Sequence, residues 1–194
     1  MHWLELSGAI LSILGVWLTA RRHMLCWPLG LASVVVYAWV FIDARLYSDA
    51  LLQGAFAVFI IYGWVRWLQH LGDDGRVVIA PLARRRMRMH MLIGAAGAVL
   101  LGASMHYGTN AALPWLDAAL AAFSLVAQFW QARRHIAAWW LWIAVDLIYI
   151  GQYIVKGLII TSVLYGVFVV LAIMGLRAWQ HAATAAHTAS VERR

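Results

Sequence analysis

Ala20-Arg21-Arg22-His23 opens a stretch of 48 residues, 20–67, that recurs without a gap as residues 132–179, at an offset of 112. Seventeen of the 48 positions are identical in the two copies. Toward the N-terminus, the match continues from Trp3-Leu4-Glu5 to Trp115-Leu116-Asp117. The identities include Trp27 with Trp139, Tyr37 with Tyr149, Gly63 with Gly175, and Trp67 with Trp179. A duplicated unit in a hydrophobic chain is typical of transporters that hold a substrate between their repeats.

The composition indicates a membrane protein. Hydrophobic residues make up 64% of the 194 residues and charged residues only 12%, whereas soluble domains carry about 25% charged residues. A helix needs about 20 mostly apolar residues to cross the hydrocarbon layer. Seven stretches meet this requirement: 3–20, 25–42, 48–68, 91–107, 114–132, 137–155 and 158–179. The sequence therefore predicts one all-α transmembrane domain with seven membrane-spanning helices.

The repeat predicts how these helices are arranged. Four helices separate equivalent positions, and because this number is even, the two units point the same way across the membrane. We expect two parallel three-helix bundles, at about 3–67 and 114–179, joined by a linker and a fourth helix within 68–113 and followed by a cytoplasmic tail, 180–194. Within the linker, residues 71–88 are predicted as a loop because they contain Gly72-Asp73-Asp74-Gly75 and Pro81. The run Arg84–Arg88 is expected to anchor the chain to the membrane surface.

The positive charges predict the orientation. Lys and Arg concentrate on the cytoplasmic side of a membrane protein. Thirteen of the 15 basic side chains fall on one side, and only Arg45 and Lys156 fall on the other. This places the N-terminus outside and the C-terminus in the cytoplasm. The net charge of +7 is explained by this bias, and no nucleic-acid partner is expected.

Polar side chains inside apolar helices mark the candidate site, because ionisable groups at bilayer depth usually face the interior of the bundle. One stripe in the helix 137–155 combines two indoles, a carboxylate and two phenols at steps of 3, 4, 3 and 4, which share one helix face. Its members are Trp139, Trp142, Asp146, Tyr149 and Tyr153. The repeat partner of Asp146 is Val34, so the carboxylate occurs in one copy only. This asymmetry suggests a site that holds its ligand in one orientation.

Amides on neighbouring helices extend the candidate site. Gln53 lies in the third stretch and Gln128 in the fifth, where Asp117, Ser124 and Gln131 share its polar stripe. Aromatic faces with amides and one carboxylate suit a neutral or cationic ring that bears hydroxyls. Hydrogen bonds between helices are an equally good explanation for the two glutamines. Five tryptophans near helix ends are expected to be anchors at the membrane interface: Trp3, Trp64, Trp67, Trp115 and Trp179.

Other chemistry finds little support in the sequence. The eight histidines show no metal-ligand spacing with a carboxylate, and Cys26 is the single cysteine, so neither a metal site nor an intrachain disulfide is expected. There is no Walker sequence and no Gly-x-Ser-x-Gly or His-Glu-x-x-His motif. We therefore expect no bound cofactor and no enzymatic activity.

Several motifs together resemble the nicotinamide riboside transporter family, PnuC, from about residue 3 to 179. They are Trp27-Pro28-Leu29-Gly30, Leu46-Tyr47-Ser48-Asp49-Ala50-Leu51-Leu52-Gln53, Tyr62-Gly63-Trp64, Trp139-x-x-Trp142-x-x-x-Asp146 with Tyr153, Lys156-Gly157-Leu158, and Val163-Leu164-Tyr165. The resemblance implies the parallel-bundle fold of SWEET sugar transporters and ligand contacts by Trp139, Trp142, Asp146, Tyr153 and Gln53. The chain departs from many members at Phe56, where they have tyrosine.

The resemblance also implies an activity: facilitated diffusion of nicotinamide riboside through the bacterial inner membrane, made unidirectional by a cytosolic nucleoside kinase. Relatives move thiamine or riboflavin, so another vitamin is an alternative. A proton-coupled transporter that titrates Asp146 and a non-transporting receptor or scaffold are further alternatives, and the sequence leaves open whether the chain forms a homo-oligomer.

Overall fold

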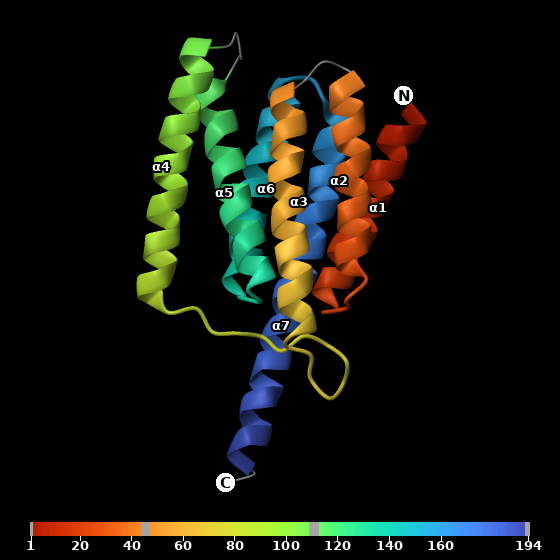
Figure 1. Cartoon of the computed structure of the whole chain (residues 1–194), viewed down its shortest axis with the longest axis vertical. Helices are drawn as coiled ribbons and strands as arrows, with labels where there is room; N and C mark the ends of the chain where they lie inside the picture. The colour runs from red at the N-terminus through yellow and green to blue at the C-terminus, as the bar shows by residue number, and fades with distance from the viewer. Residues whose placement is uncertain (1, 44–46, 109–112, 193–194) are drawn as a thin grey trace.

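The computed structural model describes residues 2–43, 47–108 and 113–192. These residues form seven α-helices that lie side by side, with the C-terminal helix projecting beyond the others (Figure 1). Their bounds are α1 His2–Ala20, α2 Cys26–Asp43, α3 Tyr47–Leu68, α4 Arg84–Gly108, α5 Pro114–Ala132, α6 Ala137–Val155 and α7 Ile159–Glu192. The predicted all-α membrane fold is confirmed. The prediction of a loop over residues 71–88 was wrong at its end, because α4 begins at Arg84, and α7 continues well past the apolar stretch 158–179.

The arginine run at the start of α4 is therefore helical and not part of a loop. Hydropathy placed the start of this helix too late because arginine lowers the local average, although arginine itself is a good helix former. Similarly, the end of α7 projects out of the bundle as a regular helix whose composition is no longer apolar (Figure 1). Helix formation and membrane insertion are separate properties, and hydropathy reports only the second.

Five helices, α2, α3, α4, α6 and α7, are long and apolar enough to cross a membrane, and α1 contains a shorter apolar part, Leu6–Ala20. The more polar α5 is the exception. It packs against α3, α4 and α6, and most of its residues are buried, including Ser124, Gln128 and Gln131. Neighbouring helices therefore shield the polar groups of α5 from lipid, which explains how a helix of this composition sits inside the bundle.

Helix contacts show the predicted parallel repeat. In the first unit α2 packs against α1 and α3, and in the second unit α6 packs against α5 and α7. Two contacts join the units, α3 with α5 and α1 with α7. These two contacts are equivalent, because the repeat makes α1 the counterpart of α5 and α3 the counterpart of α7. Among the described helices α4 packs against α5 only. This is the arrangement of two three-helix bundles joined by an extra helix.

Four tryptophans form the core at the end of the bundle nearest the α3–α4 connection. The ring centroids of Trp27 and Trp67 are 5.0 Å apart, those of Trp139 and Trp179 are 5.5 Å apart, and those of Trp67 and Trp179 are 5.9 Å apart. Neither Trp67 nor Trp179 has any exposed surface. The prediction that these two are interface anchors was wrong, because proximity to a helix end does not tell which way a side chain points.

The same cluster ties the two units together. The indole N–H of Trp67 donates to the backbone oxygen of Gln131 at 3.2 Å, and that of Trp179 donates to the backbone oxygen of Thr19 at 3.1 Å. Trp67 and Trp179 are repeat partners, and so are Thr19 and Gln131. Each unit therefore closes onto the first helix of the other through an equivalent hydrogen bond.

The connection between α3 and α4, residues 69–83, lies across this end of both units; we call it the α3–α4 linker. Its Val77 is fully buried in the tryptophan core. The backbone oxygen of Arg22 accepts from the amide of Val77 at 3.5 Å, and that of Arg134 accepts from the amide of Ala80 at 3.0 Å. The two guanidinium groups donate back to the carbonyl oxygens of Val77 and Val78. The repeat partners Arg22 and Arg134 thus hold the α3–α4 linker in place.

Candidate functional site

A cavity of about 1100 Å³ lies between the two units. Residues from α1, α2, α3, α5, α6 and α7 line it, and none from α4 does. All seven residues proposed from the sequence lie on its wall: Gln53, Gln128, Trp139, Trp142, Asp146, Tyr149 and Tyr153. Ligand pockets typically enclose about 300–1,000 Å³, so this cavity has room for a vitamin-sized solute.

The tryptophan core closes the cavity toward the α3–α4 linker. Trp27 and Trp139 line the cavity, yet they are only 3% and 1% exposed. Behind them lie Trp67, Trp179 and the buried Val77 of the linker. In the other direction the lining extends to residues near the far ends of the helices, Leu6 of α1 and Ile160 of α7. The structure therefore shows a cavity that is sealed at the linker end.

Asp146 is the acidic side chain in the cavity lining. It lies in the middle of α6 and is 5% exposed. Within the described part of the chain, it makes no hydrogen bond or ion pair. Its repeat partner Val34 lines the same cavity from α2. A carboxylate at this depth is costly without a partner, so Asp146 has unused capacity to accept hydrogen bonds from a ligand.

Trp142 is held in one orientation by Gln131. The indole N–H of Trp142 donates to the side-chain oxygen of Gln131 at 2.7 Å. Gln131 is 8% exposed, lines the cavity, and also accepts the indole of Trp67 through its backbone oxygen. The sequence placed Gln131 on the polar stripe of its helix but did not include it among the site residues. One glutamine thus joins an aromatic wall of the cavity to the core that closes it.

Three tyrosines form a second aromatic wall. The rings of Tyr149 and Tyr153 stack with centroids 5.7 Å apart. Tyr165 of α7 lies 4.8 Å from Tyr149 and 5.1 Å from Tyr153. The sequence analysis missed Tyr165 as a site residue. The repeat offset could have found it, because Tyr165 is the partner of Gln53, which lines the same cavity.

The two candidate glutamines face the cavity from opposite units, Gln53 from α3 and Gln128 from α5. Gln128 is 9% exposed and Gln53 is half-buried. No described residue forms a hydrogen bond with either side chain. The described residues therefore show no hydrogen bond by which these amides would join helices. Both amides are available to bind a solute in the cavity.

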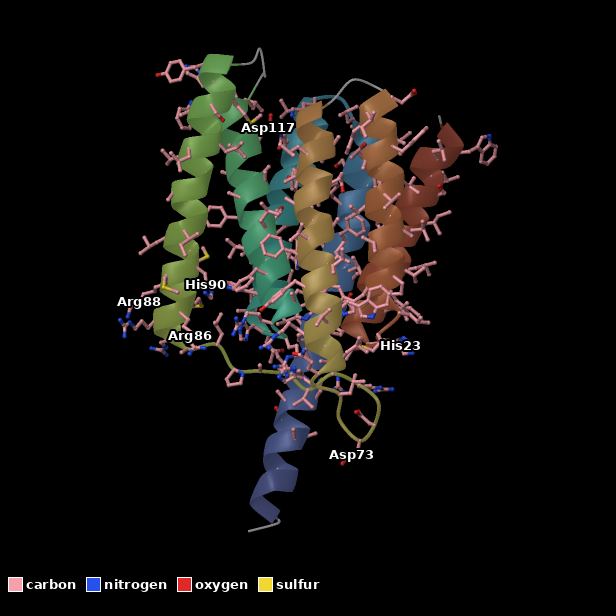
Figure 2. All side chains as sticks on the ribbon, viewed as in Figure 1. His23, Asp73, Arg86, Arg88, His90 and Asp117 are labelled. Atoms are coloured by element: carbon pink, nitrogen blue, oxygen red, sulfur yellow. The ribbon has the colours of Figure 1, made fainter. Side chains whose placement is uncertain are left out.

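Other polar groups of the sequence analysis lie elsewhere. Asp117 is not in the cavity lining; it accepts a hydrogen bond from Gln152 and lies 3.3 Å from the ammonium group of Lys156. This cluster joins α5 to α6 at the end of the bundle opposite His23, Asp73, Arg86 and Arg88 (Figure 2). The side chain of Asp49 lies outside the described residues.

The first unit contributes polar groups that the sequence analysis did not propose. Ser12, Thr19, Ser33 and Tyr37 all line the cavity, and the hydroxyls of Ser12 and Ser33 lie 2.6 Å apart. The signal was present, because Ser12 is the repeat partner of Ser124 and Tyr37 that of Tyr149. Across the described ranges, no group of three or more His, Cys, Asp or Glu side chains is arranged to hold a metal ion. The cavity is equipped for stacking and hydrogen bonding.

Comparisons with known proteins agree with this architecture. The family model described as nicotinamide mononucleotide transporter matches residues 2–181. The chain is 27% identical to the riboflavin/roseoflavin transporter RibM of Streptomyces davaonensis, over 91% of this chain and 84% of RibM. It is 22% identical to the nicotinamide riboside transporter PnuC of Escherichia coli, over 94% of this chain and 87% of PnuC. The crystal structure of a vitamin B3 transporter, PnuC, shares the fold with a TM-score of 0.76 at 24% identity, covering 94% of this chain and 82% of that one.

Proposed function

The chain belongs to the family of nicotinamide mononucleotide transporters, and on that premise we propose that it carries nicotinamide riboside through the membrane by facilitated diffusion. The observation that carries this proposal is the cavity between the two units, in which an unpaired carboxylate faces two aromatic walls and two amides. Nicotinamide riboside presents a cationic ring and a sugar with hydroxyl groups. The two halves of such a solute match the two kinds of group on the wall.

In this proposal the ring and the sugar have separate partners. The indole of Trp142 and the rings of Tyr149 and Tyr153 attract the positively charged ring through their π-faces. Asp146 accepts hydrogen bonds from the ribose hydroxyls, and its negative charge also favours a cationic solute. Gln53 and Gln128 complete the sugar contacts with donors and acceptors from both units. Trp139, which is almost fully buried, forms the floor below the ligand.

Net uptake requires a reaction that removes the nucleoside, because facilitated diffusion only runs down a concentration gradient. Phosphorylation by a cytosolic kinase does this, since it converts the nucleoside to a product whose added negative charges disfavour binding beside the Asp146 carboxylate. We propose such a kinase as the functional partner. No bound cofactor and no chemical step in the carrier itself are needed.

The proposed location is the bacterial inner membrane, with the N-terminus outside and the C-terminus in the cytoplasm. This orientation is supported by the positive charges, which gather at the linker end of the bundle, where Arg86 and Arg88 are seen in Figure 2. We also propose that residues 1–194 act as one transporter domain, in which the units 3–67 and 114–179 move against each other.

Riboflavin is the second candidate substrate, because RibM, described as a riboflavin/roseoflavin transporter, is 27% identical over most of both chains. The flavin ring is larger and uncharged. A cavity of about 1100 Å³ has room for it, and the aromatic walls would stack on it equally well. Charge is what separates the two substrates, since both carry hydroxyl groups that Asp146 can bind but only the cationic ring is attracted by a negative charge on that side chain.

Uptake into proteoliposomes tests the proposal. Purified protein is reconstituted, and the entry of radiolabelled nicotinamide riboside, riboflavin and thiamine is compared with that into protein-free liposomes. We expect saturable entry of nicotinamide riboside that needs no imposed proton gradient and that the unlabelled compound inhibits. Preference for riboflavin would change the substrate, uptake that an uncoupler abolishes would indicate proton coupling, and the absence of any flux would support a receptor or scaffold.

A further inference from the structure

A second hollow, of about 210 Å³, lies at the linker end of the bundle and shares no lining residue with the large cavity. Three arginines surround it: Arg21 and Arg22 from the turn after α1, and Arg76 from the α3–α4 linker. Ala20 and Ala178 complete the lining. Segments that are far apart in the sequence thus bring three guanidinium groups to one small space.

The charges around this hollow are not balanced. The carboxylate of Asp74 lies 3.8 Å from the guanidinium group of Arg22, too far for a hydrogen bond, and it is not part of the lining. Burial lowers the pKa of Arg22, and the positive charge of Arg76 lowers it further against the opposing effect of Asp74. Three positively charged side chains therefore line the hollow, and the repulsion between Arg22 and Arg76 is a cost that a bound anion would remove.

The side chains of Arg21 and Arg22, and the backbone that carries Arg76, are also held in place without a ligand. Arg21 lies over the ring of Trp17 at 4.2 Å from its centroid. Arg22 adopts a positive φ of 58° and donates to the carbonyl oxygen of Val77 at 3.1 Å. The backbone amide of Arg76 donates to the side chain of Asp74 at 3.0 Å, which fixes the turn that carries it. A site whose donors are already positioned loses less entropy when it binds.

The two units differ at this hollow, although both carry a pair of arginines at the linker end. Arg133 lies over Phe129 as Arg21 lies over Trp17, and these are repeat partners. Arg134 has the positive φ and the linker hydrogen bond of Arg22. The part of the α3–α4 linker that contacts Arg134, however, consists of Val78, Ile79 and Ala80, which carry no charge. Arg76 therefore adds a third guanidinium group to the first unit alone.

We propose that this hollow is a binding site for a phosphate group, carried by a phosphorylated small solute or by a lipid headgroup. Guanidinium forks match the oxygens of phosphate through paired hydrogen bonds. A phosphate here would bridge the turn after α1 to the α3–α4 linker. The linker also covers the sealed end of the large cavity, so a bound phosphate would hold that seal and slow transport. This effect on transport, unlike the binding itself, rests on the proposed function.

Calorimetric titration of the full-length protein in detergent tests the binding, with inorganic phosphate and a nucleoside 5′-monophosphate as probes at constant ionic strength. We expect saturable binding that Arg76→Ala weakens at least tenfold. The matched control is Arg88→Ala, which removes an exposed arginine of α4 and should change the affinity less than twofold. Asp74→Asn keeps the turn and removes the competing charge, so it should tighten binding. No saturable binding, or equal losses in both arginine variants, would overturn the site.

Two further arms identify the source of the phosphate and its effect. Nanodiscs of anionic or zwitterionic phospholipid show whether Arg76→Ala alters affinity for the anionic headgroup, which would assign the site to lipid. Monophosphate enclosed in proteoliposomes should slow uptake severalfold in the wild-type protein but not in Arg76→Ala. Binding without slower uptake would overturn the link to the linker seal. Binding by a protein that transports none of the three vitamins would contradict the proposed function and leave the phosphate site standing.

Discussion

Asp146 of α6 and Val34 of α2 are repeat partners that line the same cavity from opposite units. The fold is symmetric at this level, since both side chains face the space between the bundles. The chemistry is not symmetric, because one partner is a carboxylate and the other is an aliphatic side chain. The asymmetry continues around Asp146, where Trp142 and Gln131 correspond to Gly30 and Thr19. A symmetric scaffold thus carries a cavity whose two halves differ in chemistry.

Exchanging the two side chains tests this asymmetry. The double variant Val34→Asp, Asp146→Val keeps one carboxylate in the cavity but places it in the unit that lacks Trp142 and Gln131. We expect uptake of nicotinamide riboside to fall at least tenfold, to the level of Asp146→Val alone, while the protein remains folded by size-exclusion chromatography. Restored uptake would show that only the presence of a carboxylate matters.

The packing of α6 on α7 depends on the absence of a side chain at Gly175. A Cβ atom there would lie 2.6 Å from the ring of Trp139, whereas a Cβ atom at Gly166 of the same helix would meet nothing within 4 Å. Gly175→Ala should lower the free energy of unfolding by about 1–3 kcal/mol, the usual cost of overpacking. Gly166→Ala is the matched control and should be neutral or stabilising. Thermal unfolding in detergent compares them, and equal stability of the two variants would contradict the packing.

Gln131 positions the aromatic wall through its bond to the Trp142 indole. Gln131→Met removes the acceptor while keeping most of the volume, which leaves a partly buried N–H without its partner at a cost of up to about 1–3 kcal/mol. We expect the KM for uptake to rise about tenfold, the equivalent of 1.4 kcal/mol, with little change in the amount of folded protein. In the Trp142→Phe background the same substitution should have no further effect. Independent effects of the two changes would show that Gln131 acts on something else.

His135 makes stability depend on pH at the linker end. It is 7% exposed, and its Nδ1 lies 3.0 Å from the carbonyl oxygen of Ala80. Burial lowers the pKa of His135 below its ordinary value of 6.5, and Arg133 and Arg134 lower it further. The unfolded chain then binds a proton that the folded chain resists, so stability falls as the pH drops below 6.5. His135→Gln should flatten the dependence of the unfolding temperature between pH 7.5 and 5.5, and an unchanged slope would contradict this role.

Much of the fold follows from the sequence, because hydropathy and an ungapped repeat are strong signals. The helices α5 and α6 begin and end where the sequence predicted, and the 112-residue offset correctly implied two parallel bundles. Hydropathy did not predict two helical segments that contain many polar or charged residues, the start of α4 and the end of α7. Hydropathy measures transfer to lipid and not helix formation. It therefore missed the helical arginine run that starts at Arg84 and the polar end of α7, because both are helical although neither is apolar.

The sequence also predicted side chains that line one cavity, since a helical stripe with a carboxylate inside a membrane usually faces the interior of the bundle. What the sequence did not supply was the direction of individual side chains. Trp67 and Trp179 were predicted to be interface anchors, and Tyr165 and Ser33 were not proposed as site residues, although all four side chains face the interior. For Asp117, the partners Gln152 and Lys156 lie 35 and 39 residues along the chain, and such pairing depends on tertiary packing.

The most direct test of the account is the uptake of radiolabelled nicotinamide riboside by Asp146→Ala in proteoliposomes. Asp43→Ala, which removes an exposed carboxylate at the end of α2, serves as the control at equal amounts of reconstituted protein. We expect uptake by Asp146→Ala to fall to the level of empty liposomes and uptake by Asp43→Ala to match the wild type. Undiminished saturable uptake by Asp146→Ala would contradict the claim that the cavity between the repeats binds the transported solute through this carboxylate.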